Sequence, residues 1–199
     1  MKKTEVKSGK LTSFSVSGEG KFPIHLLAKC KCFPETVEGI EFDEMGICRS
    51  CASSEQKIHI DWKEREGKLK KILEKYRSRN GSFDCIVPGS GGKDSVFQAE
   101  ILKKKYNMNP LTVTFSPHIY TDSGMKNFHN WPLYGGVHNY LYTPSGDVHR
   151  KLTSLAFKNL LHPFQPFIFG QRHFASHMAL LFKIPLIFMG ESQSEAGSS

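Results

Sequence analysis

The chain has 199 residues, of which 39% are hydrophobic and 23% are charged. This length suits one α/β domain with a small appendage, and the composition excludes an intrinsically disordered chain. No apolar run approaches the about 20 residues that cross a bilayer, and residues 1–6 lack the apolar stretch of a secretory signal. We therefore expect a cytoplasmic protein without membrane contact, whose net charge of +8 suits an anionic partner.

The first part of the chain divides by composition into a tail and a cysteine-rich module. Residues 1–20 are rich in serine, glycine and lysine, which predicts a flexible tail, and residues 21–55 form the module. Its four cysteines occur as two pairs separated by fifteen residues: Cys30, Cys32, Cys48 and Cys51. Paired thiolates at this spacing predict a closed structural Zn²⁺ site with a role in folding.

Two alternatives remain open for these cysteines. A single residue separates Cys30 from Cys32, where two are typical, so His25 is an alternative ligand. Disulfides are the competing interpretation, which a reducing cytosol disfavours.

Residues 56–82 form a basic linker with a predicted helix over residues 62–79. Its lysines and arginines stand opposite an apolar stripe, the pattern of a solvated face behind a packed one. No aromatic residues interleave with the charges, so we do not expect this helix to bind nucleic acid.

A glycine-rich loop follows the first core strand. Residues 85–87 are apolar and predict a buried strand, residues 88–92 contain three glycines, and a helix is expected over residues 95–106. A strand, glycine loop and helix in this order point backbone N–H groups at a phosphate. A Walker A loop is excluded because Val87 stands five positions before Gly92 and Asp94 follows Lys93. A dinucleotide fingerprint would need glycine at position 94.

The rest of the chain alternates strands and helices. Strands are expected over residues 111–115, 139–143 and 185–190, and helices over residues 171–182 and after an N-terminal cap at Asp147. This order predicts an α/β fold for residues 83–199, a doubly wound parallel sheet with its ligand at the carboxyl ends of the strands. Cys85, in the first strand, is expected to be a small buried hydrophobe rather than a nucleophile.

The segment Ser90-Gly91-Gly92-Lys93-Asp94-Ser95 resembles the pyrophosphate loop of the ATP pyrophosphatase superfamily. Those enzymes bind ATP and expel pyrophosphate, which leaves AMP on an oxygen of the substrate. The resemblance implies catalytic roles for Lys93, Asp94 and Ser95. Lys93 would neutralise the departing pyrophosphate, which the N–H groups of residues 90–92 hold, and Asp94 would position Mg²⁺.

Other contacts with the nucleotide are also implied. The hydroxyls of Ser90 and Ser95 would contact phosphate, although helix capping is an alternative role for Asp94 and Ser95. The end of the second strand is where such folds usually seat adenosine: Thr114, Phe115 and Ser116.

A narrower resemblance extends over most of the chain. The cysteine module, residues 42–48, the loop, and residues 118–122, 127–131, 142–144 and 162–171 occur in this order. Together they resemble the N-acetyl sugar amidotransferase family of lipopolysaccharide and nonulosonic acid biosynthesis. The implied reaction adenylates the acetamido oxygen of an N-acetylated sugar or sugar nucleotide, after which ammonia displaces AMP to give an acetamidino group. The residues that we assign to the sugar are His118, Tyr120, Asp122, Asn130, Trp131, Gln165, Gln171 and Arg172.

The same resemblance implies partners. Nothing in the chain resembles a glutaminase nucleophile, so ammonia is expected from a class I glutaminase subunit, with a barrel-type companion that channels it. Members of that family continue past the strand that ends at Gly190, so we expect the sheet to be incomplete at the C-terminus and the chain to be truncated.

Two other functions fit part of the pattern. A tRNA-modifying enzyme similar to lysidine synthetase uses the same loop and would explain the positive charge. A thiolase of that group needs a later catalytic cysteine, and no cysteine follows Cys85. The second alternative is a non-catalytic module that binds zinc and nucleotide.

Overall fold

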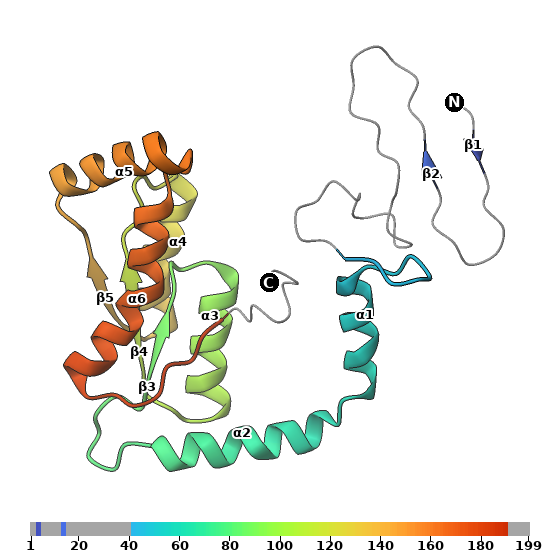
Figure 1. Cartoon of the computed structure of the whole chain (residues 1–199). Coiled ribbons are helices and arrows are strands. Elements are labelled where there is room, and N and C mark those ends of the chain that lie inside the picture. The colour runs from blue at the N-terminus through green and yellow to red at the C-terminus, as the bar shows by residue number, and fades with distance from the viewer. Residues whose placement is uncertain (1–2, 5–12, 15–40, 191–199) are drawn as a thin grey trace. The chain divides into compact units, whose positions relative to one another are not determined.

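The computed structural model of the chain describes residues 3–4, 13–14 and 41–190 (Figure 1). The chain divides into two compact units, and the boundary between them lies between Trp62 and Lys63. In the region predicted as a tail, β1 (Lys3–Thr4) and β2 (Ser13–Phe14) pair as short antiparallel strands. Within the described ranges, no helix has the length and apolar character that crossing a membrane requires.

The first unit contains a turn that leads into a short helix. Asp43 Oδ1 accepts hydrogen bonds from the N–H groups of Met45, at 2.9 Å, and Ile47, at 2.8 Å. Gly46 has a φ of 76°, which a side chain would disfavour. The turn brings Cys48 to the N-terminal cap of α1 (Arg49–Gln56), which η1 (Lys57–His59), a 3₁₀ turn, follows.

The second unit alternates strands and helices as the sequence predicts. Its elements are α2 (Trp62–Tyr76), β3 (Cys85–Pro88), α3 (Lys93–Glu100), η2 (Ile101–Lys105), β4 (Pro110–Phe115), α4 (Asp122–Gly135), β5 (His138–Tyr142), α5 (Gly146–Leu160) and α6 (Gln165–Phe182).

Strands β3, β4 and β5 form a parallel sheet in that order, which confirms the predicted α/β class. A fourth segment lies against the other edge of β3, where Ile187 bridges Ile86 in parallel. Because the chain first adds strands on one side of β3 and then on the other, the strand order reverses there. Ligands of open α/β sheets bind at such a reversal, outside the carboxyl ends of the strands.

The predicted fourth strand is present only as this single bridge. Two hydrogen bonds hold it, Ile86 N to Leu186 O and Phe188 N to Ile86 O, both at 2.8 Å. Leu186 and Phe188 direct their bonding groups toward β3, so Pro185 faces the opposite edge, where its missing N–H breaks no bond to β3.

Alternate residues of the strands enter two cores. Ile86 of β3 and Val113 of β4 pack with Met178 of α6 on one face, and Figure 1 shows α6 lying across the sheet. The other face packs against α2, α3 and α4 through Leu73, Cys85, Val87, Ala99, Leu102, Met108, Trp131 and Val137. Burial is the main cause that raises the pKa of Cys85 to about 12, and nearby Asp84 adds to it, so its thiol stays protonated, as expected of a buried hydrophobe.

Several boundaries differ from the predicted ones. Helix α2 ends at Tyr76 rather than residue 79, and the loop helix begins at Lys93 and continues as the π-helical turn η2. Ser145 precedes α5, so Asp147 lies in its first turn instead of capping it. Helix α6 begins at Gln165 rather than residue 171. Pro166 does not prevent this, because the N–H groups of a first helical turn have no partner within the helix.

Candidate functional site

Hydrogen bonds to β4 hold the start of the loop between β3 and α3, and several residues later in the loop are exposed. Gly89 N donates to Val113 O at 3.0 Å, and Thr114 Oγ1 donates to Gly89 O at 2.7 Å. Gly91 has a φ of +80°, and a Cβ there would lie 2.8 Å from the Cα of Phe128 in α4. The loop therefore fits closely between β4 and the backbone of α4. Its contacts with these two elements fix the path of its backbone.

A run of backbone N–H groups in this loop has no acceptor in the part of the chain that the structure describes. Within residues 41–190, the N–H groups from Ser90 to Ser95 form no hydrogen bond, and the first bond of α3 runs from Val96 N to Gly92 O at 3.1 Å. The first N–H groups of any helix lack partners, and the loop adds further donors to them. Such donors at a helix N-terminus make a site for an anion.

The charged residues of the predicted loop are exposed on the surface of the protein. Lys93 and Asp94 are exposed in the first turn of α3, and Ser90 and Gly92 are exposed before it. Ser95 is half-buried, and its Oγ donates to Gly92 O at 3.0 Å. The loop residues predicted to bind pyrophosphate are thus brought together around one surface.

The three residues predicted to seat adenosine differ in their surroundings. Thr114 is 1% exposed and its hydroxyl is bonded to Gly89, whereas Phe115 is half-buried among other aromatic rings, including Phe167 and Phe174. Ser116 is buried, and its N–H donates to Tyr142 O at 2.9 Å.

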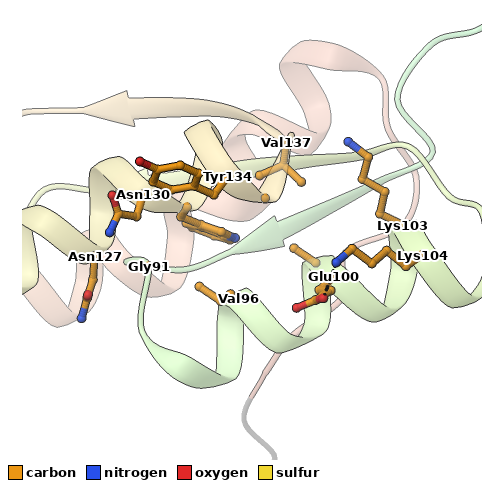
Figure 2. A pocket seen from close by; sticks show the side chains of 12 residues that line it. Gly91, Val96, Glu100, Lys103, Lys104, Asn127, Asn130, Tyr134 and Val137 are labelled. Carbon is orange, nitrogen blue, oxygen red and sulfur yellow. Dashed lines mark hydrogen bonds and ion pairs between the residues drawn. The ribbon is translucent and has the colours of Figure 1, made fainter.

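A cavity of about 330 Å³ lies between α3 and α4 and reaches Gly91 of the loop (Figure 2). Asn130 and Trp131, two of the predicted sugar residues, line it together with Asn127 of the same helix. Lys104 Nζ, at its wall, forms an ion pair with Glu100 Oε1 at 2.6 Å.

The indole of Trp131 links this cavity to the loop. Its Cη2 lies 2.9 Å from the position of a Cβ at Gly89, and its Cδ1 lies 3.6 Å from that of a Cβ at Gly135. The side chain is 2% exposed, and its Nε1 has no hydrogen-bond partner in the described chain. A buried donor of this kind is normally paired, so an acceptor from a ligand would satisfy it.

The other predicted sugar residues lie outside the cavity. Tyr120, whose hydroxyl is buried without a partner in the described chain, packs its ring near Phe128, and Asp122 is the exposed first residue of α4. Three more belong to α6: Gln165, Gln171 and Arg172.

His118 forms a pair with a residue that the sequence did not single out. Its ring stacks on that of His149 in α5, with centroids 4.0 Å apart, and its Nε2 lies 3.0 Å from Thr153 Oγ1. His149 is 9% exposed, and its Nε2 has no partner among the described residues. Burial, and secondly the neighbouring His149, lower the pKa of His118 below its ordinary value of 6.5.

This pair predicts a loss of stability in acid. The unfolded chain takes up a proton at His118 at a higher pH than the folded chain, so the free energy of unfolding falls as the pH drops below about 6.5 and levels off below the folded pKa. Urea unfolding at pH 7.5 and 5.5 measures this, and His118→Gln should reduce the difference. His177→Gln in α6 is the control, and an unchanged pH dependence in His118→Gln would contradict the expectation.

The zinc prediction falls mostly on residues that the structure does not describe. Cys30 and Cys32 lie outside the described ranges, while Cys48 is buried and Cys51 half-buried at the start of α1. Residues 3–4, 13–14 and 41–190 contain no group of three or more histidine, cysteine or acidic side chains that could hold a metal ion. The four-cysteine site stays a prediction.

Comparisons with known proteins show partial similarities. No protein-family model matches the chain. A stretch of 84 residues, 42% of this chain, is 31% identical to an uncharacterized protein of Methanocaldococcus jannaschii and covers 30% of that protein. The alignment with the NH3-dependent NAD synthetase of Campylobacter jejuni covers 69% of this chain and 59% of the synthetase chain, at 13% identity and a TM-score of 0.49.

The alignment with the NMN synthetase of Francisella tularensis covers 63% of this chain and 52% of the synthetase chain, at 14% identity and a TM-score of 0.46. The chain thus spans less than two thirds of each of these proteins. These similarities do not assign it to a family.

Proposed function

We propose that this chain is an ATP-dependent enzyme that breaks the bond between the α- and β-phosphates of ATP. The observation that supports this proposal is the run of N–H groups from Ser90 to Ser95, which find no acceptor among the described residues, at the point where the strand order reverses. These donors would hold the β- and γ-phosphates, and the exposed ammonium of Lys93 stands beside them.

The chemistry of the loop suits pyrophosphate as a leaving group. When an acceptor oxygen attacks the α-phosphorus, the bond to the bridging oxygen breaks and negative charge grows on the pyrophosphate. Fixed N–H groups and Lys93 stabilise that charge without rearrangement. Asp94 is an exposed carboxylate in the first turn of α3, an oxygen ligand of the kind that Mg²⁺ prefers, and the ion would neutralise further phosphate charge.

We further propose that the acceptor is the acetamido oxygen of an N-acetylated sugar or sugar nucleotide. Its attack forms an O-adenylyl imidate, and ammonia then adds to the imidate carbon and expels AMP to leave an acetamidino group. A class I glutaminase, with a barrel-type companion, would supply the ammonia. Asn130 and Trp131 support the placement of the acceptor in the α3–α4 cavity, because both line it beside the loop.

RNA is the weaker candidate for the anionic partner. Acidic side chains pair with several of the basic residues of α2 and η2: Lys68 with Glu64 at 2.6 Å, Lys70 with Glu66 at 3.3 Å and Lys105 with Glu66 at 3.1 Å. Hydrogen bonds from Lys105 and Lys70 are the main cause that lowers the pKa of Glu66. Part of the positive charge on this surface is therefore balanced locally.

Exchange of labelled pyrophosphate into ATP tests the proposal. With the purified full-length chain and UDP-N-acetylglucosamine, we expect exchange that needs no ammonia, and Lys93→Ala should slow it about 100-fold. Lys71→Ala, which removes an exposed lysine of α2, is the matched control and should exchange like the wild type. Equal rates in both variants, or a wild-type chain that neither exchanges nor binds ATP in calorimetry, would overturn the proposal.

The source of ammonia has its own test. Ammonium chloride should support formation of the acetamidino product by the chain alone, whereas glutamine should not. Turnover of glutamine by the purified chain would remove the glutaminase partner from the proposal.

A further inference from the structure

A chain of hydrogen bonds runs through the sheet from β5 to the phosphate loop. Asn139 Nδ2 donates to Thr112 Oγ1 at 2.9 Å and to Thr114 Oγ1 at 3.1 Å. Thr112 Oγ1 then donates to His138 O, and Thr114 Oγ1 to Gly89 O, both at 2.7 Å. One threonine hydroxyl of β4, that of Thr114, thus connects Asn139 of β5 to the loop at Gly89.

Donor chemistry fixes the direction of every one of these bonds. A backbone carbonyl only accepts, so each threonine hydroxyl uses its single proton on its carbonyl. Both hydroxyls must then accept from Asn139, whose amide nitrogen carries two protons and can serve both. An aspartate at position 139 offers only acceptors when ionised and would compete with Gly89 O for the proton of Thr114.

The chain of hydrogen bonds ends at the peptide between Gly89 and Ser90, and the orientation of this peptide decides where the Ser90 N–H points. Gly89 is fixed to β4 on both sides, because its N–H donates to Val113 O at 3.0 Å and its carbonyl accepts from Thr114. No cis peptide occurs in the described residues, so the carbonyl of Gly89 and the N–H of Ser90 point in opposite directions. With the carbonyl drawn toward Thr114, the Ser90 N–H points away from β4, where it has no acceptor in the described chain.

The sequence of β4 is unusual for a buried strand. Thr112 and Thr114 are 0% and 1% exposed and alternate with Leu111 and Val113, which pack on the α6 side. Parallel strands buried on both faces are usually continuous runs of valine, isoleucine and leucine, and a buried hydroxyl is costly unless it is bonded. The hydroxyls therefore call for a reason beyond packing.

We infer that Thr114 and Asn139 are positioning residues that aim the Ser90 N–H at the pyrophosphate of ATP. The inference rests on the proposed function. Thr114 acts through Gly89 rather than by touching the nucleotide, and Asn139 acts through Thr114. The first donor of the loop is in this way set by a side chain two strands away.

Threonine-to-valine changes at two positions separate positioning from packing. Thr114→Val removes the hydroxyl that holds Gly89, whereas Thr112→Val removes an equally buried hydroxyl of the same network that does not touch the loop. We expect Thr114→Val to raise the Kd for inorganic pyrophosphate about 10-fold in calorimetry of the full-length chain, and to raise its KM in exchange. Asn139→Asp should act in the same direction, and Thr114→Ser, which keeps the hydroxyl, should bind like the wild type.

The thermal midpoints of Thr112→Val and Thr114→Val should fall by similar amounts, while pyrophosphate binding of Thr112→Val stays close to wild type. Equal weakening of binding in both valine variants, or wild-type binding by Thr114→Val, would overturn the inference and leave the proposed function standing. A wild-type chain that binds neither pyrophosphate nor ATP would overturn the proposed function, and this inference with it.

Discussion

Gly91→Ala is expected to abolish pyrophosphate exchange. Gly91 has a φ of +80°, a region that alanine enters at a cost, and its new Cβ would lie 2.8 Å from Phe128 Cα and 3.0 Å from Asn127 O. Both contacts are with the backbone of α4, which cannot turn aside as a side chain can. The loop must therefore move, and we expect exchange to fall more than about 100-fold and the free energy of unfolding to fall by about 2–4 kcal/mol.

The neighbouring glycine provides a matched control. Gly92 has a φ of −71°, which alanine adopts readily, and among the described residues a Cβ there meets only Ser90 Oγ, at 3.7 Å. Gly92→Ala should therefore melt close to the wild-type temperature. Chemical denaturation and the exchange assay measure both variants, and a Gly91→Ala protein with wild-type stability and exchange would contradict this account of the loop.

The sequence predicts the parts of the fold that local patterns encode. The apolar runs around Ile86 and Val113 are found as β3 and β4, in the predicted parallel sheet. Helix α4 was not predicted, because Pro132 lies inside it, Gly124 lies in its first turn and Gly135 ends it. Its N-terminus is nevertheless signalled by Thr121, whose Oγ1 accepts from Gly124 N at 3.0 Å in an ordinary cap.

In the candidate site, too, local patterns predict some residues and miss others. The loop residues could be predicted because they are contiguous, and a short run of chain determines how they face a phosphate. Asn139 and Thr112 were not singled out, because their contact depends on the register of β4 against β5. The alternation of threonine with apolar residues at positions 111–114 was the available signal, since hydroxyls in a strand buried on both faces need partners.

Asp84 illustrates a residue whose role no sequence pattern indicates. It directly precedes β3, it is 4% exposed, and each of its carboxylate oxygens accepts a backbone N–H group. Oδ1 binds Ser78 N at 2.5 Å, just after α2, and Oδ2 binds Asn109 N at 2.6 Å, just before β4. One side chain thereby joins three segments at the end of the sheet opposite the phosphate loop.

Asp84→Ala is expected to cause the largest loss of stability among the changes considered. It would leave two N–H groups without their acceptor, and removing one partner of a buried hydrogen bond costs about 1–3 kcal/mol, so we expect a total loss of about 2–5 kcal/mol. Asp84→Asn retains one carbonyl oxygen for one of the two donors and should lie between alanine and the wild type. Urea denaturation followed by circular dichroism measures the series.

Pyrophosphate affinity separates this loss from an effect on the site. At a temperature where Asp84→Ala is still folded, its affinity should match that of the wild type, because Asp84 contacts Ser78 and Asn109 and not the loop. Equal stability of the alanine, asparagine and wild-type proteins would show that these two bonds contribute nothing. A folded Asp84→Ala protein with weakened pyrophosphate binding would instead show that the amino end of β3 helps to set the loop at its carboxyl end.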